Sequence, residues 1–318
     1  MTEVSATPLT QEERRAYEED GYFIRPTLFS AEEMDALGGH IEELVKLVET
    51  SDILTLEQQK AILKRTDKKG AATGLASLNN LYRIHLFSAT VRAHIRDPRR
   101  LAVATALVGP DLFCPNDLYF FKPPGTGKPI AWHQDSWYFT NSYLPDADQS
   151  IENTSIGTWL ALDDADEENG CLWVIPGSHR LGVVDHTDVE SEAYFLQKRV
   201  QVTPDMEARG IPVEVPKGAL VVFNNALLHR STTNRSTRFR RAYIVHYMKA
   251  TTRPTAQYET RNKASAEQSW GTPDAYICGQ SYPGCVPTTP EEKSMNWDRA
   301  LGRDLTESEI RLALNNGV

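Results

Sequence analysis

Hydrophobic and polar positions near the N-terminus predict two helices with a short strand between them. Thr10 with Glu13, and Ser30 with Glu33, fit the capping-box pattern that marks a helix start. After the second box, apolar residues recur near a 3.6-residue period, which predicts a helix over about 30–50 with one buried stripe: Met34, Leu37, Ile41, Leu44, Val45 and Val48. The run GYFIRP (21–26), closed by Pro26, predicts an edge strand.

The pattern changes from helical to strand-like near residue 110. Helical patterning at 88–108 is divided at Pro98, and Gly109 with Pro110 ends it. Short apolar and aromatic runs separated by turn residues then follow: LFCPNDLYFFK, PIAWHQDSWYF, IGTWLALDD, GCLWVIPG, PVEVPKG, ALVVFNN and RRAYIVHYM. Such runs favour an all-β sandwich or barrel over βαβ units.

This organisation predicts a single domain over residues 1–318, because no linker or repeat divides the chain. Residues 1–110 form a mainly helical support, and 111–250 form the β core. Within the core, the less regular segment 181–212 is long enough to be a lid over a pocket. The charged residues 51–75 are expected to form a mobile surface excursion. Residues 251–318, with a last helix after Thr306, are expected to wrap around the core.

Composition narrows the class of partner. The formal charge of −9 argues against a general nucleic-acid binder, and no run of about 20 apolar residues predicts a membrane helix. The polar N-terminus has no hydrophobic signal core, so we expect a cytoplasmic protein with a small-molecule partner. The four cysteines show no metal-binding spacing; Cys278 and Cys285 could pair or bind metal, but free thiols fit a reducing compartment better. Whether the chain forms a homodimer is left open.

The candidate chemistry centres on WHQDSWYF (132–139). In an extended strand, His133 and Asp135 would point to the same face, because side chains alternate with a period of two. Together they would supply two of the three ligands of a 2-His-1-carboxylate iron site, which leaves three positions for substrates and oxygen. The H-x-D pattern alone is weak, since a surface histidine and an aspartate in a turn give the same letters.

A second histidine and an arginine strengthen the metal interpretation. His229 follows His133 by 96 residues and, taken alone, fits a structural histidine. Arg240 opens the strand RRAYIVHYM, and one hairpin would place it beside His229. A guanidinium can hold a carboxylate through two parallel hydrogen bonds, and the hydroxyl of Ser231 can add a third. Two histidines, one aspartate and this arginine are the minimum for a 2-oxoglutarate-dependent oxygenase.

Three long motifs resemble the phytanoyl-CoA dioxygenase family of Fe(II)/2-oxoglutarate oxygenases: FFKPPGTGKPIAWHQD (120–135), WLALDDADEENGCLWVIPGSH (159–179) and GALVVFNNALLHRSTTNRSTRFRRAY (218–243). They lie within residues 75–250, in the family's order. The resemblance implies a double-stranded β-helix, a jelly-roll and cupin-like core that is mainly β, with flanking helices.

The same resemblance implies a cofactor set and a role for each matching residue. The cofactors would be Fe(II), 2-oxoglutarate and O2. The iron ligands would be His133, Asp135 and His229. The 2-oxoglutarate contacts would be Arg240, eleven residues after the distal histidine, with Ser231, Trp159 and Asn116.

The implied reaction is hydroxylation of an unactivated C–H bond, with release of succinate and CO2. Asp135 disfavours halogenation, since related halogenases have a small residue there. Two alternatives remain open: a metal-binding cupin that works without oxidation, and a binding protein that has lost catalysis. The substrate is not indicated, nor is hydroxylation separated from desaturation or rearrangement.

Several other residues have plainer interpretations. His179 is expected to be structural, and His246 has no carboxylate at a suitable spacing in the sequence. Trp137, Tyr138 and Phe139 fit a pocket lining and a jelly-roll core equally well.

Overall fold

The N-terminal helices begin where the capping boxes predict. The computed structural model describes residues 7–50, 80–82, 84–86, 88–125, 127–189, 194, 198–255 and 275–278. Helices α1 (Gln11–Asp20) and α2 (Ala31–Glu49) start after Thr10 and Ser30, each with both capping-box hydrogen bonds. Between them, β1 (Tyr22–Arg25) is the predicted edge strand. Helices α4 (Ala89–Ile95) and α5 (Pro98–Val108) divide at the proline, as expected.

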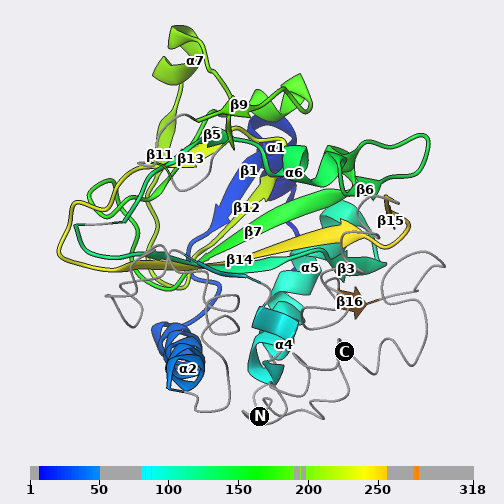
Figure 1. The fold of residues 1–318 in the computed structure, drawn as a ribbon. Helices are drawn as coiled ribbons and strands as arrows, with labels where there is room; N and C mark the ends of the chain where they lie inside the picture. The colour runs from blue at the N-terminus through cyan, green and yellow to red at the C-terminus, as the bar shows by residue number, and fades with distance from the viewer. Residues whose placement is uncertain are drawn as a thin grey trace.

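Most of the described strands belong to two sheets that face each other, and two further pairs, β9 with β10 and β6 with β15, lie outside them (Figure 1). Within the described chain the major sheet has eight strands. Six follow the order β1-β12-β7-β14-β3-β16; β4 also pairs with β14, and β2 pairs with β4. Their bounds are β2 Asn80–Tyr82, β3 Leu112–Cys114, β4 Asp117–Lys122, β7 Ser155–Ala161, β12 Leu220–Asn224, β14 Arg240–Lys249 and β16 Ala275–Cys278. The minor sheet has the order β11-β8-β13-β5, with β5 Ile130–His133, β8 Leu172–Val174, β11 Ile211–Val213 and β13 His229–Ser231. This is the predicted jelly-roll core.

Short elements connect these strands. They are η2 Ile84–Leu86, α6 Asp135–Thr140, β6 Tyr143–Leu144, η3 Ile151–Asn153, η4 Ser178–Leu181, β9 Thr187–Asp188, β10 Lys198–Arg199, α7 Pro204–Ala208 and β15 Arg253–Pro254. The predictions for residues 51–75, for most of 251–318 and for Cys285 lie outside the described residues. No helix in the described part of the chain is long and apolar enough to cross a membrane.

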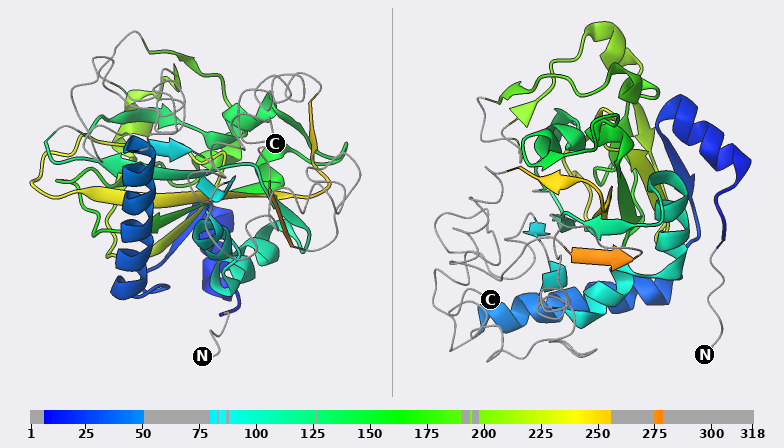
Figure 2. Two further views of the ribbon diagram at one scale, coloured as in Figure 1. Left: turned by 60° about the horizontal axis from the view of Figure 1, so that its bottom comes forward. Right: turned by 90° about the vertical axis from the view of Figure 1, so that its right-hand side faces the viewer.

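The major sheet is buried on both faces. Helices α2, α4 and α5 cover one face, and the minor sheet covers the other (Figures 1 and 2). Strand β14 shows the consequence, because Tyr243 and Val245 pack in the helix-side core while Ala242 and Ile244 pack inside the jelly roll. Strand side chains alternate between faces, so Arg240 and His246 share the inner face with Ala242 and Ile244. This alternation positions the site described below.

A glycine beneath an aromatic ring connects the core to the site. A Cβ at Gly157, in β7, would lie 2.3 Å from Cζ of Phe223, whose ring centroid is 5.1 Å from that of His229. Gly157→Ala should therefore lower the free energy of unfolding by about 1–3 kcal/mol, because overpacking forces the ring to move. Urea unfolding followed by circular dichroism would measure the change.

Gly39 provides the matched control, since it is exposed on α2 and a Cβ there meets nothing within 4 Å. Gly39→Ala should stabilise the protein by up to about 1 kcal/mol through helix propensity. Equal effects of the two substitutions would contradict the close packing of Phe223.

Candidate metal centre

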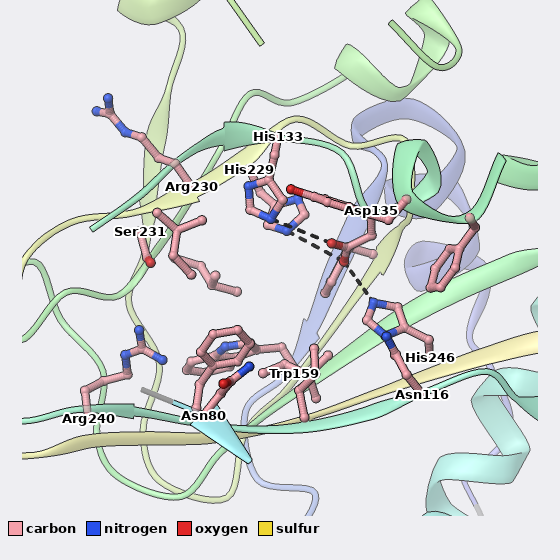
Figure 3. Close-up of a pocket in the computed structure, with 18 residues that line it drawn as sticks. Asn80, Asn116, His133, Asp135, Trp159, His229, Arg230, Ser231, Arg240 and His246 are labelled. Carbon is pink, nitrogen blue, oxygen red and sulfur yellow. Dashed lines mark hydrogen bonds and ion pairs between the residues drawn. The ribbon is translucent and has the colours of Figure 1, made fainter. Parts of the chain in front are cut away.

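A cavity of about 420 Å³ lies between the two sheets (Figure 3). Polar residues gather at its two ends, and apolar side chains line the space between them. The lining includes Asn80, Asn116, Leu118, Phe120, His133, Asp135, Tyr138, Phe139, Trp159, Leu172, Phe223, His229, Ser231, Arg240, Ile244 and His246. The three predicted iron ligands and the four predicted 2-oxoglutarate contacts are all among them, so folding brings the predicted site residues into one space.

One end of the cavity carries a group that can hold a metal ion. One ligand atom each from His133, Asp135 and His229 lies within 4.8 Å of the others. Nε2 of His133 is 3.6 Å from Oδ1 of Asp135, and Nε2 of His229 is 3.7 Å from Oδ2. The two histidines are Cα partners across β5 and β13, which explains how residues 96 apart in sequence meet.

The protonation of these groups suits metal binding. Nδ1 of His133 donates to the carbonyl of Ala131 (2.8 Å), and Nδ1 of His229 donates to the carbonyl of Leu227 (2.9 Å). In the neutral form of each ring, a proton on Nδ1 leaves the lone pair of Nε2 free to bind a metal. Burial, with the charge of His229, lowers the pKa of His133 to about 3, so that ring stays neutral. Burial opposes ionisation of Asp135, but the charges of His229 and His246 lower its pKa below the ordinary value.

The prediction of one extended strand through 132–139 was wrong. Strand β5 ends at His133, and Asp135 begins the short helix α6. The intervening Gln134 is fully buried, and its amide donates to the carbonyls of Gly182 (2.8 Å) and Ala226 (2.7 Å). These tertiary hydrogen bonds fix a corner, so Asp135 reaches the histidines from a helix start instead of from the strand face.

The other end of the cavity carries an unpaired cation. Arg240 is 1% exposed, and among the described residues no carboxylate forms an ion pair with it. Its Nε and the Oγ of Ser231 are buried without hydrogen-bond partners. Burial lowers the pKa of Arg240 to about 10, so it remains charged at neutral pH. A buried cation without a partner is costly, and an anionic ligand would satisfy both groups.

Two further residues shape this end. The ring of Trp159 lies 5.7 Å from the Arg240 guanidinium carbon, on the predicted cosubstrate side. Lys122 is the Cα partner of Arg240, and its buried Nζ donates to the carbonyls of Lys128 and Thr232 (2.6 Å each). Burial, with the charge of Arg240, holds the pKa of Lys122 well below its usual range. Sequence reasoning missed this second buried basic side chain beside Arg240.

The predicted hairpin beside His229 was also wrong. His229 lies in the minor sheet and Arg240 in the major sheet, so the two face each other across the cavity instead of pairing on neighbouring strands. The neighbour Arg241 points to the opposite face, where it pairs with Asp163 (2.7 Å) and Glu42 (2.6 Å). Only the first of the two consecutive arginines can therefore reach the cavity.

His246 was missed by the sequence reasoning. It lines the cavity, and its Nε2 lies 2.9 Å from Oδ2 of Asp135, so the companion carboxylate is the predicted iron ligand itself (Figure 3). Nδ1 of His246 contacts the side-chain oxygen of Asn116. Asn116 therefore lies at the end of the cavity that holds Asp135, away from Arg240 in Figure 3. Its contact with 2-oxoglutarate stays a prediction.

The neighbouring aromatic residues divide between the cavity and its surroundings. Tyr138 and Phe139 line the cavity, whereas Trp137 stacks on His186 with ring centroids 4.7 Å apart. His179 contacts the carbonyl of Glu18 at 3.3 Å and is not part of the lining. The lid proposed for 181–212 stays a prediction, because residues 190–193 and 195–197 lie outside the described chain.

Comparison with known proteins identifies the family. The family model described as Phytanoyl-CoA dioxygenase (PhyH) matches residues 17–242, more than two thirds of the chain. The chain belongs to the phytanoyl-CoA dioxygenase family. The match confirms the family indicated by the three motifs, and it includes all three triad residues and Arg240. The cofactors of this family are Fe(II), 2-oxoglutarate and O2.

Relatives and solved structures agree with this family. The zebrafish "Phytanoyl-CoA dioxygenase domain-containing protein 1" is 25% identical over 277 residues, covering 76% of this chain and 91% of that protein. The ectoine dioxygenase of Bordetella parapertussis is 27% identical over 239 residues, covering 72% of each.

Among solved structures, the non-heme monooxygenase ThoJ in its apo form has a TM-score of 0.64 at 19% identity, covering 95% of this chain and 97% of that one. EctD from S. alaskensis, with 2-oxoglutarate and 5-hydroxyectoine, has a TM-score of 0.57 at 19% identity, covering 79% and 80%. At these identities the structures support the jelly-roll fold alone.

Proposed function

We propose that this chain is an Fe(II)- and 2-oxoglutarate-dependent dioxygenase that hydroxylates an unactivated C–H bond of a small molecule. The observation that carries the proposal is the two-ended cavity. One end has the His133, Asp135 and His229 donor set, and the other has Arg240 with no counterion among the described residues. Family membership makes the cofactor set Fe(II), 2-oxoglutarate and O2, and the two ends of the cavity match the first two of these.

The donor set fits Fe(II). His133, Asp135 and His229 would hold the ion on one side, as two neutral imidazoles and one carboxylate do in non-haem iron oxygenases. Bound iron would couple decarboxylation of 2-oxoglutarate to succinate with transfer of the second atom of O2 to the substrate C–H. The carboxylate of Asp135 occupies the third ligand position, which argues against a halogenase.

The chain's own residues orient and enclose the cosubstrate. The guanidinium of Arg240 would donate hydrogen bonds to the distal carboxylate of 2-oxoglutarate, and the Ser231 hydroxyl would donate to the same group. Trp159 would limit the position of the bound dicarboxylate from the side. The apolar lining between the two ends, with Leu118, Phe120 and Ile244 among its members, would exclude water and place the substrate C–H near the metal.

The other two interpretations receive less support. A cupin that uses its metal without oxidation has no need for a buried, unpaired arginine opposite the metal site. A catalytically silent binding protein would not require that Nε2 of both histidines lies beside the carboxylate of Asp135.

A metabolite screen tests the function directly. The protein with Fe(II), ascorbate and 2-oxoglutarate should form succinate in a substrate-dependent way from at least one pool of small molecules, with matching O2 consumption. His133→Ala, prepared identically, provides the background from free iron. Succinate formation at the same rate in both proteins would refute the proposed activity.

A further inference from the structure

The carboxylate of Asp135 is bound from outside the triad. Its Oδ2 lies 2.9 Å from Nε2 of His246, closer than either oxygen lies to the Nε2 atoms of His133 or His229. A carboxylate can only accept, so Nε2 of His246 must carry the proton that joins them. One oxygen of the predicted metal ligand is thus already used in a hydrogen bond.

The ring of His246 is held firmly in this position. It is 2% exposed, and its Nδ1 contacts the side-chain amide of Asn116. The backbone N–H of His246 also donates to the carbonyl of Asn116, at 3.1 Å. Phe139 packs edge-on against the ring with centroids 5.2 Å apart. Contacts at both nitrogens and on the ring leave little freedom, so the N–H stays directed at Asp135.

We propose that His246 is a positioning residue that reserves Oδ2 of Asp135 and leaves the carboxylate only one oxygen for the metal. Three single-atom protein ligands leave three coordination positions open, which 2-oxoglutarate and O2 together require. A carboxylate that bound through both oxygens would take one of those positions. His246 would in this way keep the position for O2 free. The inference rests on the proposed metal site, and its first measurement does not require 2-oxoglutarate.

The test compares three variants in anaerobic solution. His246→Leu should weaken Fe(II) binding by about 10- to 100-fold, the usual effect of losing a partner that orients a metal ligand. With Fe(II) and 2-oxoglutarate saturating, its affinity for nitric oxide, used as a probe for the open O2 position, should fall by at least about tenfold. His246→Gln retains an N–H near the place of Nε2 and should recover most of both affinities. Asn116→Ala frees the ring and should fall between His246→Leu and wild type.

Controls separate positioning from folding. The metal-free proteins are compared by circular dichroism and thermal midpoint, and His179→Leu, outside the cavity, should bind Fe(II) and nitric oxide like wild type. Wild-type affinities for both in His246→Leu would overturn the inference. A lower midpoint with an unchanged Fe(II) affinity would also overturn it, because His246 would then be structural only. If the variants change the affinity for Fe(II) as expected but the wild-type protein does not bind 2-oxoglutarate, the result would count against the proposed function and not against this role of His246.

Discussion

Each of the substitutions His133→Ala, Asp135→Ala and His229→Ala should abolish tight Fe(II) binding and turnover. Each change deletes one of three protein ligands, and His246, whose Nε2 is hydrogen-bonded to Asp135, is the one further histidine or carboxylate among the residues that line the cavity. We expect the affinity for Fe(II) to fall by more than about 100-fold, beyond the effect of losing an orienting partner. Iron stoichiometry after anaerobic loading, together with succinate formation, measures both consequences.

Two further variants sharpen the ligand assignment. Asp135→Gly should retain weak iron binding through the two histidines while leaving an additional coordination position open. His179 is not part of the cavity lining, and its Nε2 contacts the carbonyl of Glu18. His179→Ala should therefore bind iron like the wild-type protein. Unchanged iron content and activity in any one of the three alanine variants would show that its residue is not a ligand.

Much of this site could be predicted because its signals are local or belong to family motifs. The capping boxes at Thr10 and Ser30 depend on contacts three residues apart, and the structure has both. His133, Asp135 and His229 lie in long motifs in which the spacing itself is informative.

The rest depends on contacts that the sequence does not display. The corner at Gln134 is fixed by carbonyls of Gly182 and Ala226, the second 92 residues away, so the run 132–139 gave no sign of where the strand ends. His246 meets a carboxylate 111 residues earlier in the chain. One signal could have found it: His246 lies six positions after Arg240 on one strand, so a cavity-facing Arg240 predicts a cavity-facing His246.

Arg240→Ala should abolish tight 2-oxoglutarate binding while leaving the iron ligands in place. The guanidinium is buried and unpaired, so the distal carboxylate of 2-oxoglutarate would be its counterion. Removing one partner of such a buried pair typically costs about 2–5 kcal/mol, or roughly 30- to several thousand-fold in affinity. Titrating 2-oxoglutarate into the anaerobic Fe(II) protein, and following the metal-to-ligand charge-transfer absorption, measures the loss directly.

The neighbouring arginine supplies the matched control for this prediction. Arg240→Lys keeps the charge but loses the planar fork, so its affinity should lie between wild type and Arg240→Ala. Arg241→Ala breaks the pairs with Asp163 and Glu42 on the helix face, so it should lower the thermal midpoint and leave 2-oxoglutarate binding nearly unchanged. The two side chains are adjacent in sequence but lie on opposite faces of the strand. A larger loss of 2-oxoglutarate affinity in Arg240→Ala than in Arg241→Ala would therefore reflect the position of Arg240 in the cavity. Wild-type affinity in Arg240→Ala, or a larger loss in Arg241→Ala, would mean that another residue binds the cosubstrate.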